Sequence, residues 1–368
     1  MTSFSGRWST TFGAMLIEQR GSKVTGTYGH GASAGRVEGS VRGTVLRFRY
    51  AEPGERGTGE FRLLRAGKFS GGYTAKGSRH SLPWDGHRGW DGIWETDFGR
   101  MRLMHEHTRV HGFYSGAGHS SLLGSASGAA LAFNYKERNA AGEGRFTLVA
   151  DAQSFTGRWR ARGRRNWQPW SGRRAHPTPG VTWLVVLEAH WQGSLAEPEY
   201  SFGNMLREVF ARLPQVRVRQ RYFHDAGSLE HGCRELLYIA EPAILLIASH
   251  ALAGGLSVRG ELIDTARVLD SLRFAENLSL LHFSSCLVAL AGRKAFGRRP
   301  WPVSGYATRI DWGASALIEF TYFDLVLNRG MTPAEAAATL PLLVPYAGNR
   351  APRGSPYRAA GFRFFPAG

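Results

Sequence analysis

An internal duplication in the first half of the chain most constrains the fold. Five residues of one copy recur 86 positions later in the same order: Trp8, Thr10, Phe12, Gly13 and Met15 correspond to Trp94, Thr96, Phe98, Gly99 and Met101. After one deletion the match continues, and it ends with Trp84 and Gly86 standing opposite Trp170 and Gly172. Repetition at a fixed period indicates repeated structural units. We therefore expect two homologous units, residues 1–88 and 89–174.

Within each unit the apolar residues alternate with polar ones. Met15 and Ile17 lie two positions apart, as do Leu46, Phe48 and Tyr50. A period of two is typical of half-buried strands, and glycines between the runs suit the turns that join them. A unit of this length has room for roughly six to eight short strands. The sequence therefore predicts two tandem antiparallel β-barrel repeats.

The repeat resembles small up-and-down barrels of the avidin or lipocalin kind through its Gly-x-Trp start and its Gly-x-Tyr hairpin. Such barrels hold one small ligand inside or at a mouth. Arginine and tryptophan side chains favour an anionic, aromatic ligand. Two other interpretations stay open: the aromatic ladder is simply core, and the basic stretch is a charged edge strand. The candidate ligand contacts are Trp84, Trp159, Arg160, Arg162, Trp167 and Trp170.

Charge is concentrated in the duplicated half. Residues 1–174 carry 27 Lys and Arg against 13 Asp and Glu, a net charge of +14, whereas residues 175–368 carry a net charge of only +3. This predicts an anionic partner for the first half, either nucleic acid, a nucleotide or an acidic surface, unless the charge serves solubility. With two cysteines, no secretory signal and no apolar run of membrane-spanning length, we expect a cytoplasmic protein without a disulfide scaffold.

The second half has a different composition. Residues 175–180, with two prolines and a glycine, predict a linker. From residue 181 to 368, apolar runs alternate with helical patterns, which indicates an α/β domain with a mostly parallel sheet. Strands are expected at 182–188, 216–223, 243–249, 278–285 and 303–310. Helices are expected at 202–213, 229–240, 258–272, 315–327 and after a cap at Thr332.

A histidine and a cysteine follow two of these strands. His250 comes directly after the third strand, and Cys286 comes directly after the fourth. In parallel sheets the chemistry lies beyond the carboxyl ends of the strands, so neighbouring strands would bring the two side chains together. An imidazole that takes the thiol proton makes a nucleophile of the sulfur. We also expect a helix to begin at Cys286, with its dipole favouring the thiolate.

The order strand–His, helix, strand–Cys resembles the caspase-like cysteine peptidases, which include caspases, metacaspases and CHAT peptidases. The resemblance covers about residues 181–330, through LLIASHALAGGL, LSLLHFSSCLVALAG and VSGYATRIDWGASALIEF. It implies peptide-bond hydrolysis through an acyl-enzyme without a metal or other cofactor. Cys286 is then the nucleophile and His250 the general base. The family has glycine after its histidine; here Ala251 follows.

Further residues are candidates for this site. Gly254 and Gly255 are the expected source of backbone donors for an oxyanion hole, and Asp311 and Glu319 are expected to make the substrate pocket acidic and to favour a basic P1 residue. His282 is an alternative base, and His224 with Asp225 either lines the site or starts a turn. Cys233, on a helix, is expected to be structural.

The resulting hypothesis is a ligand-activated cysteine protease that acts on protein substrates. Bacterial chains of this build resemble antiviral effectors released by a nucleotide second messenger, such as a cyclic ADP-ribose isomer from a TIR enzyme. One rival hypothesis is a nucleic-acid- or ligand-binding protein with an inactive peptidase-like fold. Another is a pair of carbohydrate- or peptide-binding barrels with a scaffolding role. The oligomeric state is not predicted.

Overall fold

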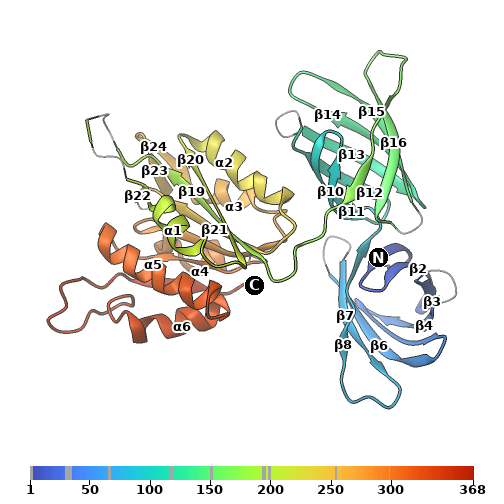
Figure 1. The fold of residues 1–368 in the computed structure, drawn as a ribbon, viewed down its shortest axis with the longest axis horizontal. Coiled ribbons are helices and arrows are strands. Elements are labelled where there is room, and N and C mark those ends of the chain that lie inside the picture. The colour runs from blue at the N-terminus through green and yellow to red at the C-terminus, as the bar shows by residue number, and fades with distance from the viewer. Residues whose placement is uncertain are drawn as a thin grey trace. The chain divides into compact units, whose positions relative to one another are not determined.

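The structure, a computed structural model, describes residues 3–29, 35–64, 68–116, 120–149, 152–192, 196–197, 200–252, 255–297 and 299–368. The chain divides into two compact units, Met1–Ala175 and His176–Gly368 (Figure 1). The first unit holds two antiparallel barrels, and the second holds a mixed sheet with helices. In the described part of the chain, no helix combines the length and the apolar character needed to cross a membrane.

The first copy of the repeat folds into a closed barrel of eight strands. From β1 to β7 each strand pairs antiparallel with the next, and β9 pairs with both β7 and β1, which closes the ring. The short strand β8 pairs with β7 outside the ring. The bounds are β1 (Gly6–Thr10), β2 (Gly13–Arg20), β3 (Lys23–Tyr28), β4 (Gly35–Arg42), β5 (Val45–Glu52), β6 (Glu55–Leu63), β7 (Lys68–Ala75), β8 (Leu82–Pro83) and β9 (Gly86–Arg88).

The second copy repeats this barrel strand for strand. Strands β10 to β16 and β18 form the ring, and β17 is the short addition beside β16. The two tandem barrels predicted from the duplication are therefore present. The bounds are β10 (Gly92–Thr96), β11 (Gly99–Glu106), β12 (Arg109–Tyr114), β13 (Ser120–Ser127), β14 (Ala130–Lys136), β15 (Ala141–Leu148), β16 (Ser154–Ala161), β17 (Gln168–Pro169) and β18 (Gly172–Arg174).

A buried arginine lies over a tryptophan in each barrel. The guanidinium of Arg88 is 4.6 Å from the ring centre of Trp8, and that of Arg174 is 4.2 Å from the ring centre of Trp94. Both arginines donate hydrogen bonds to carbonyls at matching positions of their own repeat, so a buried charge is compensated in the same way twice. The acceptors are the carbonyls of Ser3 and Ser5 in the first repeat and of Gly89 and Asp91 in the second.

Aromatic side chains fill both barrels. Trp84 is 1% exposed and Trp170 is 2% exposed, and each forms edge-to-face contacts with rings from several strands. The inward residues of each ring make one apolar cluster. This packing corrects the expectation that Trp84 and Trp170 contact a ligand: they are core residues, as is usual for large aromatics in a small barrel.

The second unit has a six-stranded sheet in the order β20-β19-β21-β25-β26-β27. All its pairings are parallel except that of the edge strand β27, so the predicted mostly parallel sheet is present. Its strands are β19 (Thr182–Ala189), β20 (Val216–Phe223), β21 (Ala243–Ala248), β25 (Leu278–Ser284), β26 (Val303–Tyr306) and β27 (Phe362–Phe365). A separate small sheet contains β22 (His250–Leu252), β23 (Gly255–Val258) and β24 (Glu261–Asp264).

Helices cover both faces of the large sheet (Figure 1). On one face α1, α5 and α6 share a core with alternate residues of β19 and β21. On the other face α2 packs beside Leu187, and Phe296 of α4 contacts Phe283. The helices are α1 (Phe202–Phe210), α2 (Ala226–Glu235), α3 (Thr265–Ser271), α4 (Gly292–Phe296), α5 (Trp312–Leu327) and α6 (Pro333–Leu343), with 3-10 turns at Leu236–Tyr238 and Val288–Ala291.

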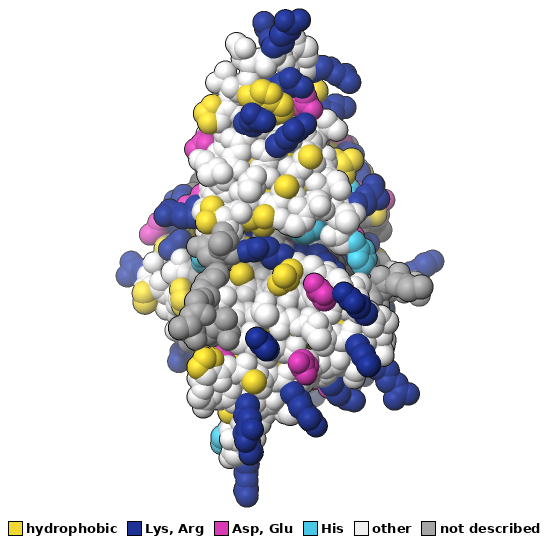
Figure 2. Space-filling model, turned by 90° about the vertical axis from the view of Figure 1, so that its right-hand side faces the viewer, with side chains coloured by type: hydrophobic (Ala, Val, Ile, Leu, Met, Phe, Trp, Pro, Cys, Tyr) yellow, Lys and Arg dark blue, Asp and Glu magenta, His cyan; other side chains and the backbone are white. Residues whose placement is uncertain are grey.

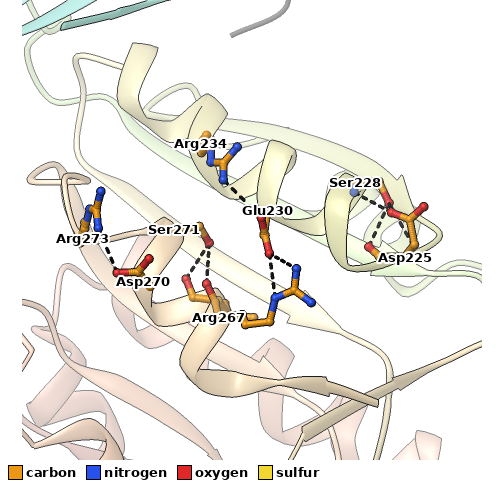
Figure 3. Close-up of polar contacts among 9 residues, drawn as sticks. Asp225, Ser228, Glu230, Arg234, Arg267, Asp270, Ser271 and Arg273 are labelled. Carbon is orange, nitrogen blue, oxygen red and sulfur yellow. Dashed lines mark hydrogen bonds and ion pairs between the residues drawn. The ribbon is translucent and has the colours of Figure 1, made fainter. Parts of the chain in front are cut away.

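Charged contacts join α2 to α3. Glu230 on α2 accepts two hydrogen bonds from Arg267 on α3, at 3.0 and 2.7 Å, and one from Arg234 on its own helix at 3.2 Å (Figure 3). Asp225 caps the start of α2 through Ser228. Both Arg267 nitrogens donate to one Glu230 oxygen while Arg234 bonds to the other, and such a surface pairing adds little stability.

Two local predictions were wrong. The helix expected at 258–272 begins only at Thr265, because Arg259 and Gly260 both have positive φ, at 50° and 82°, and form the two-residue turn between β23 and β24. Such a turn is the preferred connection of a β-hairpin. No helix begins at Cys286 either: Leu287 has a φ of 62°, and a 3-10 turn follows at Val288.

Candidate active site

Three parallel strands end in one row at the edge of the sheet. Glu188 of β19 pairs with Ala248 of β21, and Ala248 pairs with Ser284 of β25. His250 and Cys286 each follow two residues after this paired row. The two strands are therefore adjacent, as predicted. His250 and Cys286 lie at equal distances along the chain beyond the carboxyl edge of the sheet.

The residues just before His250 and Cys286 hold the two segments together. The Ser249 amide donates to Ser285 Oγ at 3.2 Å, and Ser249 Oγ donates to the carbonyl of His250 at 2.8 Å. Both serines are buried. These contacts continue the strand pairing beyond the ladder, so the backbones that carry the two reactive side chains are tied together.

His250 and Cys286 line one pocket of about 130 Å³. This volume approaches the roughly 150 Å³ of a protein cavity that holds one benzene molecule. Of the eleven lining residues, four are Trp, Tyr or Phe and four are serines, and none is acidic. The pocket therefore suits one apolar side chain beside the thiol. The other lining residues are Trp191, Tyr200, Phe202, Ser249, Ser284, Ser285, Ile310, Trp312 and Ser315.

The Cys286 sulfur has polar contacts with the backbone of Ile310, which lies between β26 and α5. The Ile310 amide donates to Sγ at 3.4 Å, and Sγ lies 3.6 Å from the Ile310 carbonyl oxygen. An amide aimed at sulfur stabilises negative charge there, which is the contribution that we expected from a helix dipole. Leu287 follows in the left-handed conformation, a strained geometry for a branched side chain that is typical of functional sites.

His250 is exposed and begins the hairpin strand β22, where it pairs with Ser257. Its imidazole meets Trp191 edge to face, with ring centres 5.2 Å apart and an interplanar angle of 88°. The exposed imidazole lines the pocket and is open to a bound substrate. This environment suits a general base.

Glu188 is a positioning residue that the sequence did not reveal. Its fully buried carboxylate accepts hydrogen bonds from the Trp191 indole at 2.6 Å and from the backbone amides of Phe202 and Gly203 at 2.7 and 3.0 Å. Ser201 Oγ also donates to it at 2.6 Å. A carboxylate at the first turn of α1 is favoured by the helix dipole. Glu188 thus fixes one wall of the pocket, which includes Trp191 and Phe202.

The structure does not bring the predicted acidic residues into the pocket. Glu319 is fully buried and accepts a hydrogen bond from the Tyr306 hydroxyl at 2.8 Å. The exposed Asp311 caps α5 by accepting from the Ala314 amide. Neither lines the pocket. The expectation of an acidic pocket for a basic P1 residue is therefore corrected, because both carboxylates are used within the fold.

The other candidates near Cys286 also lie elsewhere. His282 is fully buried, with Nδ1 2.8 Å from Ser304 Oγ and Nε2 3.2 Å from Glu319, so it faces the core and not the pocket. Gly255 lies in β23, where a Cβ would meet the carbonyl of Ile263 at 2.4 Å. It serves close strand packing rather than the pocket. Gly254 lies outside the described residues.

The remaining sequence candidates of this unit are structural. Asp225 is the N-cap of α2, and the His224 ring stacks on that of His190 at 4.9 Å. Burial raises the pKa of Cys233 to about 12, so this thiol stays protonated and inert. Among the described residues, no group of three or more His, Cys, Asp and Glu side chains is placed to hold a metal ion.

The candidate ligand contacts of the second barrel separate into two sets. Trp159 is half buried and packs against Phe98 and Tyr135, so it belongs to the barrel interior. Arg160 and Arg162 line a groove of about 950 Å³. Trp167 lies on the same side of the barrel, beneath the arginines of β16.

Comparisons with known proteins do not assign the chain to a family. No protein-family model matches it, and no curated protein matches it. One solved structure that resembles it in part is oligopeptidase B from Trypanosoma brucei with covalently bound antipain, in its closed form. The identity is 7% and the TM-score 0.15, with 76% of this chain and 62% of that chain covered. The chain thus spans less than two thirds of that protein, and so low a score supports neither a fold nor a function.

Proposed function

We propose that the second unit is a cysteine endopeptidase of caspase-like arrangement, with Cys286 as the nucleophile and His250 as the general base. The observation that carries this proposal is the shared strand register: His250 and Cys286 follow paired residues of adjacent parallel strands and line one pocket. A buried structural cysteine or a surface histidine would have no reason to share a concave site with the other.

The chemistry follows from the two groups. His250 takes the thiol proton, and the sulfur attacks the peptide carbonyl. The oxyanion collapses to a thioester as the amine leaves with the proton from His250. Water then attacks the thioester, giving up a proton to the imidazole, and the carboxylic acid product leaves as the thiol is restored. The Ile310 amide and carbonyl contact the sulfur at 3.4 and 3.6 Å and hold it beside the pocket.

The pocket predicts the kind of residue that is cleaved. Trp191, Tyr200, Phe202 and Trp312 offer ring surface, and the lining carries no acidic group to pair with Lys or Arg. Burial of an apolar side chain there gains about 25 cal/mol for each Å² removed from water. We therefore expect an apolar P1 side chain, and a peptide with Leu or Phe should be cleaved in preference to one with Arg.

The test uses full-length protein and unfolded casein, with the new N-termini identified by mass spectrometry. We expect cleavage by the wild type and by Cys233→Ala, which removes the other thiol, and no cleavage by Cys286→Ala or His250→Ala. Each protein is assayed alone and with pyrophosphate or ADP, because a ligand-activated protease would be latent otherwise. Equal cleavage by wild type and Cys286→Ala would remove the basis of the proposal.

A rival function, nucleic-acid binding with an inactive peptidase-like unit, is suggested by the +14 charge of residues 1–174. Figure 2, in which the barrels face the viewer, shows Lys and Arg side chains spread over the surface with few Asp and Glu among them. This hypothesis predicts binding that weakens steeply with salt for any long polynucleotide, and no dependence on Cys286.

A further inference from the structure

The second barrel carries a groove between two of its connections. The groove, here called the basic groove, has a volume of about 950 Å³ and is formed by residues 134–143 and 160–165. These residues belong to the β14–β15 hairpin and to the end of β16 with the turn that follows it. The volume lies at the upper end of the range of ligand pockets, which is roughly 300–1,000 Å³.

Positive side chains dominate the basic groove. Of its two acidic residues, Glu143 is paired with Arg160 at 2.7 Å, and Glu137 accepts from the Tyr114 hydroxyl at 2.7 Å. In the described part of the chain, none of the other groove cations has an acidic partner. The field in the groove therefore favours an anion with several charges. The groove cations are Lys136, Arg138, Arg160, Arg162, Arg164 and Arg165.

A tryptophan next to the groove orders the neighbouring arginines. The guanidinium of Arg160 is 4.6 Å from the ring centre of Trp167, that of Arg158 is 4.9 Å away, and that of Arg145 is 5.9 Å away. Such contacts restrain long side chains that would otherwise lose rotamer freedom when they bind. Of these three arginines only Arg160 lines the basic groove, so Trp167 restrains one groove cation and adds two further cations beside the groove.

The first barrel provides an internal comparison, because it has the same scaffold. The positions that correspond to Arg160, Arg164 and Trp167 are Thr74, Ser78 and Ser81. Arg162 and Arg165 have basic counterparts in Lys76 and Arg79, whereas Arg160, Arg164 and Trp167 have none, so only part of the cluster recurs in the first copy. The duplication alone does not require this cluster, so the barrel fold does not explain it.

The groove found on the first barrel has a different character. It is lined by three cations, Lys23, Arg47 and Arg49, and two acids, Glu38 and Glu60. Arg47 is bonded to Glu60 at 2.8 Å. Charge there is nearly balanced, which leaves little attraction for an anion even though the volume, about 1040 Å³, is similar. This groove lies along β3 to β7 rather than at the hairpin that matches β14–β15, so the two grooves differ in place as well as in charge.

We propose that the basic groove binds a small ligand that carries two or more phosphate groups and is of nucleotide size. Arginine forks match phosphate oxygens in pairs, and the five groove cations other than Arg160 exceed what a single carboxylate would need. The groove spans residues 134–143 and 160–165, and its volume fits a small ligand within the usual range. This inference concerns binding by the first unit, so it stands or fails independently of the peptidase proposal.

The test measures binding of pyrophosphate, ADP and a single-stranded oligonucleotide to full-length protein by calorimetry at two salt concentrations. Arg162→Ala/Arg165→Ala removes two exposed cations of the groove. The matched control, Lys76→Ala/Arg79→Ala, removes two cations from the same positions of the first barrel. We expect pyrophosphate and ADP to bind the wild type and the control alike. In the groove variant, losing charge-assisted bonds should weaken both by about tenfold or more.

Three results would overturn the inference. They are no heat with either phosphate compound at millimolar concentration, equal losses in the two double variants, or an oligonucleotide that binds more tightly than ADP with a steep salt slope. The last result would favour the nucleic-acid hypothesis. The calorimetry measures binding by the first unit and needs no protease activity. A failed protease assay would therefore leave the result of the binding test unchanged.

Discussion

Replacing Glu188 by Gln should destabilise the second unit. The side chain keeps almost the same size, but one of its two buried hydrogen-bond acceptors becomes a donor. One carboxylate oxygen accepts from the Trp191 indole and the Phe202 amide, and the other from the Ser201 hydroxyl, the Gly203 amide and the Gln220 side chain. In Gln one of these oxygens becomes an NH2 group. If it is the first oxygen, the Trp191 and Phe202 N–H groups face a donor; if it is the second, the Gly203 amide does, because the Ser201 hydroxyl and the Gln220 amide can turn over.

The expected cost follows from these bonds. Hydrogen bonds to a charged group contribute about 1.5–3 kcal/mol each, so one to two lost bonds predict a loss of about 2–5 kcal/mol. With a urea m-value of about 2–3 kcal/mol per molar, the unfolding midpoint should fall by about 1–2 M. Such a change is large for a substitution that keeps the side-chain volume.

The assay is urea unfolding followed by helical circular dichroism. All helices of the described residues belong to the second unit, so this signal reports on that unit. The control is Glu208→Gln, an exposed position on α1, the helix whose first turn bonds to Glu188, and it should leave the midpoint unchanged. A midpoint for Glu188→Gln within the error of the control would refute the role that we assign to the buried carboxylate.

Two further predictions concern the barrels. Trp84→Ala should destabilise the first unit by about 3–5 kcal/mol, because it empties the centre of an aromatic core, whereas Leu82→Ala, at an exposed position nearby, should change little in chemical unfolding. His105 is 8% exposed, and burial lowers its pKa to about 4. The unfolded chain takes up this proton below pH ~6.5, so stability present at pH 7 should be lost between about pH 6.5 and 4, by up to about 3 kcal/mol. In thermal unfolding, His105→Gln should not lose this stability as the pH falls. His111→Gln, at an exposed position, should lose it as the wild type does.

Much of the fold could be read from the sequence, because periodic burial leaves a periodic pattern. The matched positions around Trp8 and Trp94 predicted two barrels, and the apolar run 243–249 predicted the buried strand β21. The capping box at Thr332 and Glu335 is present as predicted. These features depend on local sequence and on simple alternation, which a single chain displays directly.

Features that depend on contacts between distant residues were not predictable. The carboxylate of Glu188 lies at the end of a strand but bonds to residues 13 to 15 positions later. Glu319 and Asp311 were expected to line the pocket because they follow the fifth expected strand. Instead, Glu319 accepts a hydrogen bond from the buried Tyr306 hydroxyl, and Asp311 caps α5. The signal that could have corrected the helix at 258–272 was present: Arg259-Gly260 is a dipeptide suited to a hairpin turn.

The pH dependence of Cys286 alkylation tests the central claim most directly. Iodoacetamide reacts with the thiolate, and mass spectrometry separates Cys286 from Cys233, whose buried thiol with its raised pKa provides an unreactive internal reference. If His250 is the partner base, Cys286 should react well below the pH at which a free thiol ionises, and His250→Ala should shift this reaction to higher pH. The same profile in both proteins, at the pH of an ordinary thiol, would contradict a thiol–imidazole pair.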